Sequence, residues 1–242
     1  MKNKKEISDL GKITRWYFSD RIGSFDNLLI SYWYRKLKTY FVGKTMLEIG
    51  PADGMMTKLL IPDFEQLYVL DAVREFVRKA KLLDKKVVGF VDLVEEFKTD
   101  LRFDNIIISH VLEHVEDPVL VLKKCSDWLN PQGRIHIVVP NANSFHRQIG
   151  VQMGLLEKST DLNDLDKKIG HRRVYDRSSL DRDIRTAKLQ TLAQGSMFIK
   201  FLSNSQMQGL QDPQLFEAFY QLSHQFPLNG SDLFSVVSKY ED

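Results

Sequence analysis

The sequence predicts an α/β protein built on a doubly wound, mostly parallel sheet of seven strands. Short apolar runs alternate with segments whose apolar residues recur at helical spacing, which is typical of parallel strands joined by crossover helices. The 242 residues suffice for one large domain, and a composition of 43% hydrophobic and 27% charged residues is that of an ordinary globular protein. We find no internal repeat or low-complexity tract that would indicate another architecture.

The first 42 residues predict an N-terminal helical cap. Aromatic residues recur at helical spacing between residues 10 and 42, and Gly23-Ser24 interrupts the pattern, so we expect two helices. Their simplest role is a packed lid or a face of the core. We therefore divide the chain into a cap, residues 1–42, and an α/β domain, residues 43–242.

Apolar runs between residues 45 and 139 predict the first five strands, each leading into a turn or a helical segment. Pro118 suits the first turn of a helix, where its missing N–H costs nothing, and Asn130-Pro131-Gln132-Gly133 predicts the turn that ends this helix. The expected strands are 45–49, 67–70, 87–91, 105–108 and 135–139, and the expected helices are 55–61, 73–83, 94–97 and 118–129.

Beyond the fifth strand the chain becomes polar, and we interpret residues 141–178 as an insertion over the sheet. The charged run 161–168 within it indicates a solvated face or a mobile lid. A helix followed by two strands that flank another helix favours an antiparallel closing hairpin, so we expect the last strand to run antiparallel. The expected elements are helix 179–186, strand 197–202, helix 213–225 and strand 233–238.

The charge balance excludes some partners. The 34 Lys and Arg residues nearly cancel the 32 Asp and Glu residues, so a net charge of +2 favours neither nucleic acid nor an anionic membrane. We expect no membrane span, because no stretch approaches about 20 apolar residues, and no signal peptide, because no apolar run follows the basic start. The single cysteine, Cys125, forms no internal disulfide, which fits a reducing compartment and a cytoplasmic location.

The exit of the first strand carries the clearest site motif. In doubly wound sheets ligands bind at the carboxyl ends of the strands, and here Glu48 is followed by small residues at Gly50, Ala52 and Gly54. Asp71, 21 positions after the first glycine (71 − 50), ends the second strand where a carboxylate would bind ribose hydroxyls. Together they predict a nucleoside ligand. The dinucleotide fingerprint would place its third glycine at position 55, which is methionine.

These residues resemble motifs of the class I S-adenosylmethionine-dependent methyltransferases, in which an acidic residue precedes G-x-G-x-G and the sheet is Rossmann-like. Only Ala52 departs, replacing the middle glycine. Segments 91–93, 109–118 and 129–141 extend the resemblance over roughly residues 43–145, toward the branch of ubiquinone-biosynthesis O-methyltransferases and natural-product and sugar methyltransferases. It implies S-adenosylmethionine as cofactor, S-adenosylhomocysteine as product, and as cofactor-binding residues Glu48, Gly50, Ala52, Gly54, Asp71, Ala72, Asp92, Leu93, Ser109 and His110.

Methyl transfer from a sulfonium is an in-line displacement, so alignment and water exclusion matter most and a base is optional. Four histidines are candidate catalytic residues: His110, His114, His146 and His171. His110 ends the fourth strand, and Glu113 and His114 would share its face if a helix begins there. The alternatives remain open: a cofactor contact or packing for His110, an orienting network for Glu113 and His114, and surface positions for His146 and His171.

The string His110-x-x-Glu113-His114 contains metal-ligand types, and some ubiquinone-type methyltransferases resemble it with E-x-x-E-H. Imidazole at position 110 disfavours magnesium. A zinc-hydrolase interpretation needs a helix there, and the early turn at residues 116–118 argues against one. We predict no bound metal.

Four further residues are predicted to bind substrate: Arg172, Arg173, Tyr175 and Asn141. The block 170–175 resembles a segment of the same methyltransferase branch. Two adjacent guanidinium groups offer bidentate donors to a carboxylate or phosphate, although a solvated or salt-bridged loop is the simpler explanation.

The predicted function is S-adenosylmethionine-dependent methyl transfer to an oxygen or nitrogen of a small-molecule metabolite, by a monomer or homodimer that binds neither nucleic acid nor membrane. Two alternatives stay open. One is a non-catalytic protein that binds S-adenosylmethionine or S-adenosylhomocysteine, because fold alone does not license a reaction. The other is a nicotinamide-dependent oxidoreductase.

Overall fold

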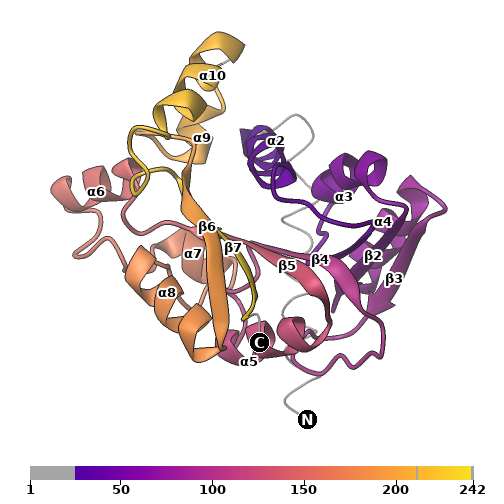
Figure 1. Cartoon of the computed structure of the whole chain (residues 1–242). Helices are drawn as coiled ribbons and strands as arrows, with labels where there is room; N and C mark the ends of the chain where they lie inside the picture. Colours follow the sequence, from indigo (N-terminus) through magenta and orange to yellow (C-terminus); the bar gives the residue numbers. More distant parts are fainter. Residues whose placement is uncertain (1–24, 211, 241–242) are drawn as a thin grey trace.

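The computed structural model describes residues 25–210 and 212–240, which form a seven-stranded sheet with helices on both faces (Figure 1). The strand order is β3-β2-β1-β4-β5-β7-β6, and β7 runs antiparallel to both of its neighbours. The predicted fold class, including the antiparallel last strand, is therefore confirmed. The strands are β1 (Thr45–Ile49), β2 (Gln66–Asp71), β3 (Val87–Val91), β4 (Phe103–Ser109), β5 (Leu129–Pro140), β6 (Leu189–Met197) and β7 (Asp232–Lys239).

Two hydrophobic clusters lie on opposite faces of the sheet, because its strands are apolar on both sides as in other covered parallel sheets. Helices α2, α3 and α4 cover one face, and α5 and α8 cover the other (Figure 1). The described helices are α2 (Phe25–Lys38), α3 (Met55–Leu60), α4 (Arg74–Leu83), α5 (Pro118–Asp127), α6 (Phe145–Gln152), α7 (Asp164–Lys168), α8 (Arg177–Thr186), α9 (Asn204–Met207) and α10 (Pro213–Leu222), and a 3₁₀ turn covers Ile61–Asp63.

The predicted strand 197–202 is wrong, because the sixth strand occupies residues 189–197. Its outer positions are polar, as suits an edge strand, so apolar alternation does not mark it. The apolar residues that prompted the prediction instead enter the core as a loop, in which Phe198 and Ile199 are fully buried.

The predicted helix 94–97 is a single hydrogen-bonded turn. Residues 111–115 after β4 also form one turn, so the helix on which a shared face of His110, Glu113 and His114 depended does not begin there. Helix α5 ends at Asp127, and residues 130–133 form an irregularity within β5 instead of a turn before it. The pairing of β4 with β5 jumps there from Leu129 to Arg134.

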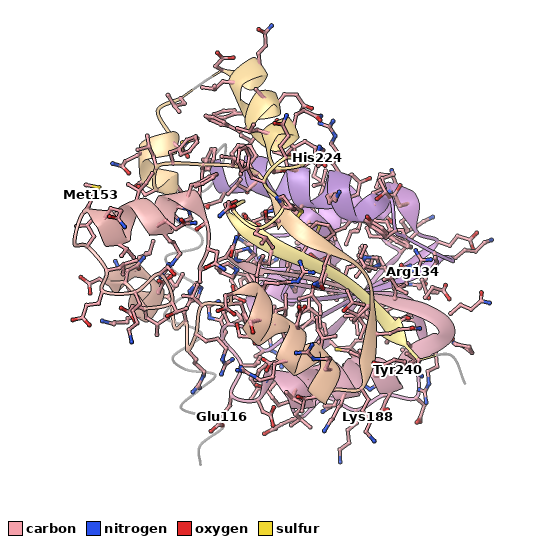
Figure 2. All side chains as sticks on the ribbon, turned by 60° about the vertical axis from the view of Figure 1, so that its left-hand side comes forward. Glu116, Arg134, Met153, Lys188, His224 and Tyr240 are labelled. Carbon is pink, nitrogen blue, oxygen red and sulfur yellow. The ribbon has the colours of Figure 1, made fainter. Side chains whose placement is uncertain are left out.

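Helix α2 packs into the same hydrophobic cluster as the sheet, through side chains such as Leu29, Trp33 and Leu37. The first predicted helix of the cap lies outside the described residues, and the division at residue 42 stays a prediction. The insertion after β5 contains α6 and α7, and Figure 2 shows Met153 at its outer end. Cys125 is fully buried in α5, and none of the described helices is long and apolar enough to cross a membrane.

Candidate active site

A pocket opens at the carboxyl ends of β1 to β4 and contains most of the predicted cofactor-binding residues. Parallel strands bring their carboxyl ends to one edge, so residues far apart in sequence converge there. Glu48, Gly54 and Ser109 do not line the pocket. The predicted residues that do are Gly50, Ala52, Asp71, Ala72, Asp92, Leu93, His110 and His114, and Ile169 of the insertion also lines it.

The turn after β1 depends on its small residues. Gly50 and Gly54 adopt left-handed φ values of 77° and 85°, and Ala52 shares this region at 48°. A Cβ atom at Gly50 would lie 2.6 Å from a methyl group of Val111, so this position tolerates only glycine. The turn brings its backbone to the pocket immediately before α3 begins at Met55.

Glu48 is the acidic residue just before this turn, and it does not line the pocket. Its side chain is buried and accepts a 2.6 Å hydrogen bond from the Thr57 hydroxyl of α3. Burial raises the pKa of Glu48 to about 8, although the Thr57 hydrogen bond lowers it. This hydrogen bond links β1 to α3, and the predicted contact of Glu48 with the cofactor stays a prediction.

Asp71 ends β2 inside the pocket, as the ribose prediction requires. One carboxylate oxygen accepts a 2.7 Å hydrogen bond from the Val73 backbone N–H, which fixes the side chain. Burial raises the pKa of Asp71 to about 7, more than this hydrogen bond lowers it. The group accordingly changes charge near neutral pH. The role of Asp71 as ribose ligand stays a prediction.

His110 lies between two carboxylates. Its Nδ1 is 3.2 Å from Glu113 Oε1 and its Nε2 is 3.1 Å from Asp232 Oδ1. Burial lowers the pKa of His110, but Glu113 and Asp232 outweigh this effect and raise it to about 10. The imidazole is thus an imidazolium at neutral pH, with both nitrogens occupied. The prediction that His110 acts as the base is not supported by this geometry.

Sequence reasoning missed two residues beside His110. The Trp33 indole of α2 stacks on the imidazole, with ring centroids 4.5 Å apart, and its N–H donates to Asp232 at 3.1 Å. Asp232 opens β7, and because this strand is antiparallel its first residue faces the carboxyl ends of the others. The predicted antiparallel strand could have indicated Asp232, whereas Trp33 had no distinguishing signal among the aromatic residues of its helix.

His114 lines the pocket and packs edge-on against His171, with ring centroids 4.6 Å apart. Burial lowers the pKa of His114 to about 4, so this imidazole is neutral. His171 Nδ1 lies 3.0 Å from Asp166 in the charged run 161–168, which is partly buried here and not simply a solvated face. Ligand atoms of Glu113, His114 and His171 lie within 4.8 Å of one another, and the predicted absence of a metal is untested.

The two adjacent arginines, Arg172 and Arg173, donate hydrogen bonds to backbone carbonyl groups. Arg173 donates to the carbonyls of Leu112 and Val115, each at 2.7 Å, and Arg172 Nε donates to His114 O at 2.8 Å. They attach residues 170–175 to the turn after β4, which lines the pocket. A substrate clamp by these arginines stays a prediction.

Tyr175 and Asn141 do not face a ligand space. Tyr175 is 1% exposed and its hydroxyl donates to Asp183 of α8 in the core. Asn141, also 1% exposed, donates to the carbonyls of Leu228 and Gly230. Their burial does not support the predicted substrate contacts. His146 lies instead in the first turn of α6, where burial and the Lys200 charge lower its pKa.

A parallel sheet with a glycine turn after β1 and a carboxylate at the end of β2 defines an α/β protein of the nucleoside-cofactor class. A family model described as "Methyltransferase domain" matches residues 27–194, and the chain belongs to this family. Its sheet is that of the class I S-adenosylmethionine-dependent methyltransferases.

Among similar proteins, a ubiquinone biosynthesis O-methyltransferase of Xylella fastidiosa is 27% identical over 107 residues, which cover 41% of this chain and 43% of that protein. The match therefore spans less than half the length of this curated relative. The N-methyltransferase NodS of Bradyrhizobium japonicum, solved with S-adenosylhomocysteine, superposes with a TM-score of 0.63 at 15% identity, covering 98% of this chain and 99% of that one. An S-adenosylmethionine-dependent methyltransferase of Archaeoglobus fulgidus gives 0.59 at 17% identity, covering 88% and 94%.

Proposed function

We propose that the protein transfers a methyl group from S-adenosylmethionine to an oxygen or nitrogen of a small-molecule acceptor. The observation that carries the proposal is the joining of the glycine turn, Asp71 and His110 in one pocket of a methyltransferase-family sheet. The ubiquinone-pathway relative and NodS, named as an O-methyltransferase and an N-methyltransferase, support both acceptor atoms.

The residues fit this cofactor. Asp71 would bind the ribose hydroxyls, Asp92 and Leu93 would hold the adenine, and the backbone at Gly50 and Ala52 would approach the remainder. When bound, the cofactor supplies a methyl group on a sulfonium. The chain's own part is to align the acceptor and exclude water.

Deprotonation of a hydroxyl acceptor needs an unprotonated base, and His110, whose pKa is raised to about 10, does not provide one at neutral pH. His114 is a neutral imidazole that lines the same pocket. We assign it as the candidate base if the acceptor is a hydroxyl group. An amine acceptor needs only to arrive deprotonated.

The remaining assignments belong to the same proposal. The acceptor is a small metabolite, the protein acts in the cytoplasm as a monomer or homodimer, it uses no metal, and residues 1–42 form a cap. No described helix spans a membrane, and the net charge of +2 gives no reason to expect nucleic acid.

Thermal unfolding with and without S-adenosylhomocysteine tests the cofactor. Saturation at about a hundred times Kd adds roughly 2.7 kcal/mol and raises Tm. The shift should be lost in Asp71→Asn and kept in Asp127→Asn, an exposed carboxylate of α5. Transfer of a tritiated methyl group to a panel of phenols and amines then distinguishes an enzyme from a non-catalytic binding protein. A Tm shift with nicotinamide dinucleotides alone would contradict the proposal.

A further inference from the structure

Lys200 is a buried cation that has no ion-pair partner among residues 25–210 and 212–240. Its side chain follows β6 at the carboxyl edge of the sheet and is 6% exposed. Among the described residues no carboxylate oxygen lies within 4.0 Å of Nζ, whose hydrogen-bond partner is the Asn204 amide oxygen. Buried charges in proteins are normally paired, so this ammonium group has donors that the described chain does not use.

The nearest carboxylates are bound to other groups. Asp232 and Asp26 both raise the pKa of Lys200, yet burial lowers it to about 8. Asp232 accepts hydrogen bonds from Trp33 and Ser231 and faces His110, and Asp26 accepts from the Asn204 amide at 2.6 Å. Both carboxylates act on Lys200 through their charge, but neither forms an ion pair with it within 4.0 Å.

His146 supplies a second unused polar group. Its Nδ1 atom is buried and has no hydrogen-bond partner in the described part of the chain. The charge of Lys200 is one of the causes that lower the pKa of His146, so the two side chains are near enough to interact. The rings of the neighbouring residues Phe145 and Phe201 stack on each other, so α6, which carries His146, and the segment after β6, which carries Lys200, are in contact.

Aromatic residues adjoin this pair. Phe145 and Phe201, which neighbour His146 and Lys200 in sequence, stack with ring centroids 5.5 Å apart, and Phe226 packs edge-on against Phe145 at 5.6 Å. Phe201 and Phe226 are 41% and 40% exposed, so the aromatic cluster reaches the surface. It offers an apolar surface next to the buried cation.

We propose that Lys200 and His146 bind a carboxylate of the acceptor, and that the acceptor's apolar or aromatic body rests on Phe145, Phe201 and Phe226. This inference rests on the proposed methyl transfer and names its substrate class as apolar acids. Asp232 faces His110, which lines the cofactor pocket, and its charge also acts on Lys200, so Asp232 links this subsite to the cofactor pocket.

Isothermal titration calorimetry of the full chain with S-adenosylhomocysteine tests the subsite. Benzoate, 4-hydroxycinnamate and decanoate are each compared with the corresponding primary amide. We expect at least one acid to bind about tenfold or more tighter than its amide. Lys200→Met should remove this preference without changing the Kd of S-adenosylhomocysteine, and the exposed Lys168→Met of α7 should keep it.

Lys200→Arg keeps the positive charge and controls for a folding defect in Lys200→Met. Nitrogen-15 spectra of labelled histidines give a second readout, because the acid should shift the His146 ring signal. Equal binding of every acid and its amide, binding of none, or an unchanged preference in folded Lys200→Met would overturn the subsite. If the unaltered chain does not bind S-adenosylhomocysteine, the methyltransferase proposal is overturned instead. The two failures can be told apart, because the acids and amides can also be compared without S-adenosylhomocysteine.

Discussion

The two sides of His110 are built in different ways. On the cofactor side, the pocket consists of strand ends and the turns that directly follow them, such as Gly50 after β1 and Asp71 in β2. On the side where we propose that the acceptor binds, Trp33, His146, Lys200 and Asp232 come from four separate segments of the chain. The first half is therefore encoded locally, whereas the second exists only once the whole sheet has formed.

The largest expected effect is on the cofactor side, at Gly50. Gly50→Val places a branched side chain at a left-handed φ and against Val111, so we expect loss of S-adenosylhomocysteine binding and about 2–4 kcal/mol less unfolding free energy. Calorimetry and urea unfolding measure these changes. Gly154→Val, also at a left-handed φ but with open space around it, isolates the backbone cost, and equal losses in both variants would contradict the steric explanation.

Asp71 should show the next largest effect, through its charge. Asp71→Asn keeps the shape but removes the carboxylate, so we expect about 10–100-fold weaker S-adenosylhomocysteine binding at pH 8. Because burial raises the pKa of Asp71 to about 7, affinity in the unaltered chain should fall as the pH drops below 7. This dependence should vanish in Asp71→Asn, and titrations at several pH values would show whether it persists.

Asp232→Asn removes the carboxylate that contacts both His110 and Trp33. The folded pKa of His110 is about 10, above its ordinary value of 6.5, so His110 contributes stability below pH 6.5 that is lost as the pH rises through 10. Loss of the Asp232 charge should lower this pKa and cost about 1–3 kcal/mol at neutral pH. Histidine NMR titration measures the pKa directly, and titration of His110 near pH 6.5 in the unaltered chain would refute the ion-pair assignment.

The smallest effect is expected at Arg173, which joins the insertion to the cofactor side. Arg173→Lys removes the forked donors to Leu112 and Val115, so we expect about 1 kcal/mol less stability and a severalfold weaker cofactor affinity. Arg185→Lys, an exposed site on α8, should change neither. If the two variants have the same stability and the same affinity for S-adenosylhomocysteine, the proposed structural role of Arg173 is contradicted, and the predicted substrate clamp becomes the better explanation.

The sequence predicted the fold class and most elements because buried parallel strands are continuous apolar runs with small residues at their exits. It failed at β6, whose polar edge positions hide the alternation. It also gave no sign that the Glu48 side chain is buried, because this depends on the hydrogen bond from Thr57 of α3. The charge state of His110 could not be predicted from the sequence either, because its partner Asp232 lies 122 residues away along the chain.

The position of Cys125 has a practical consequence. It is the sole cysteine of the chain, it is fully buried in α5, and burial raises its pKa, so thiol reagents should leave it untouched in the folded protein. A cysteine introduced at exposed Leu155 would then be a unique attachment point for a spectroscopic label on the insertion. Distances from that label to an intrinsic tryptophan would report directly whether the insertion moves when the cofactor and acceptor bind.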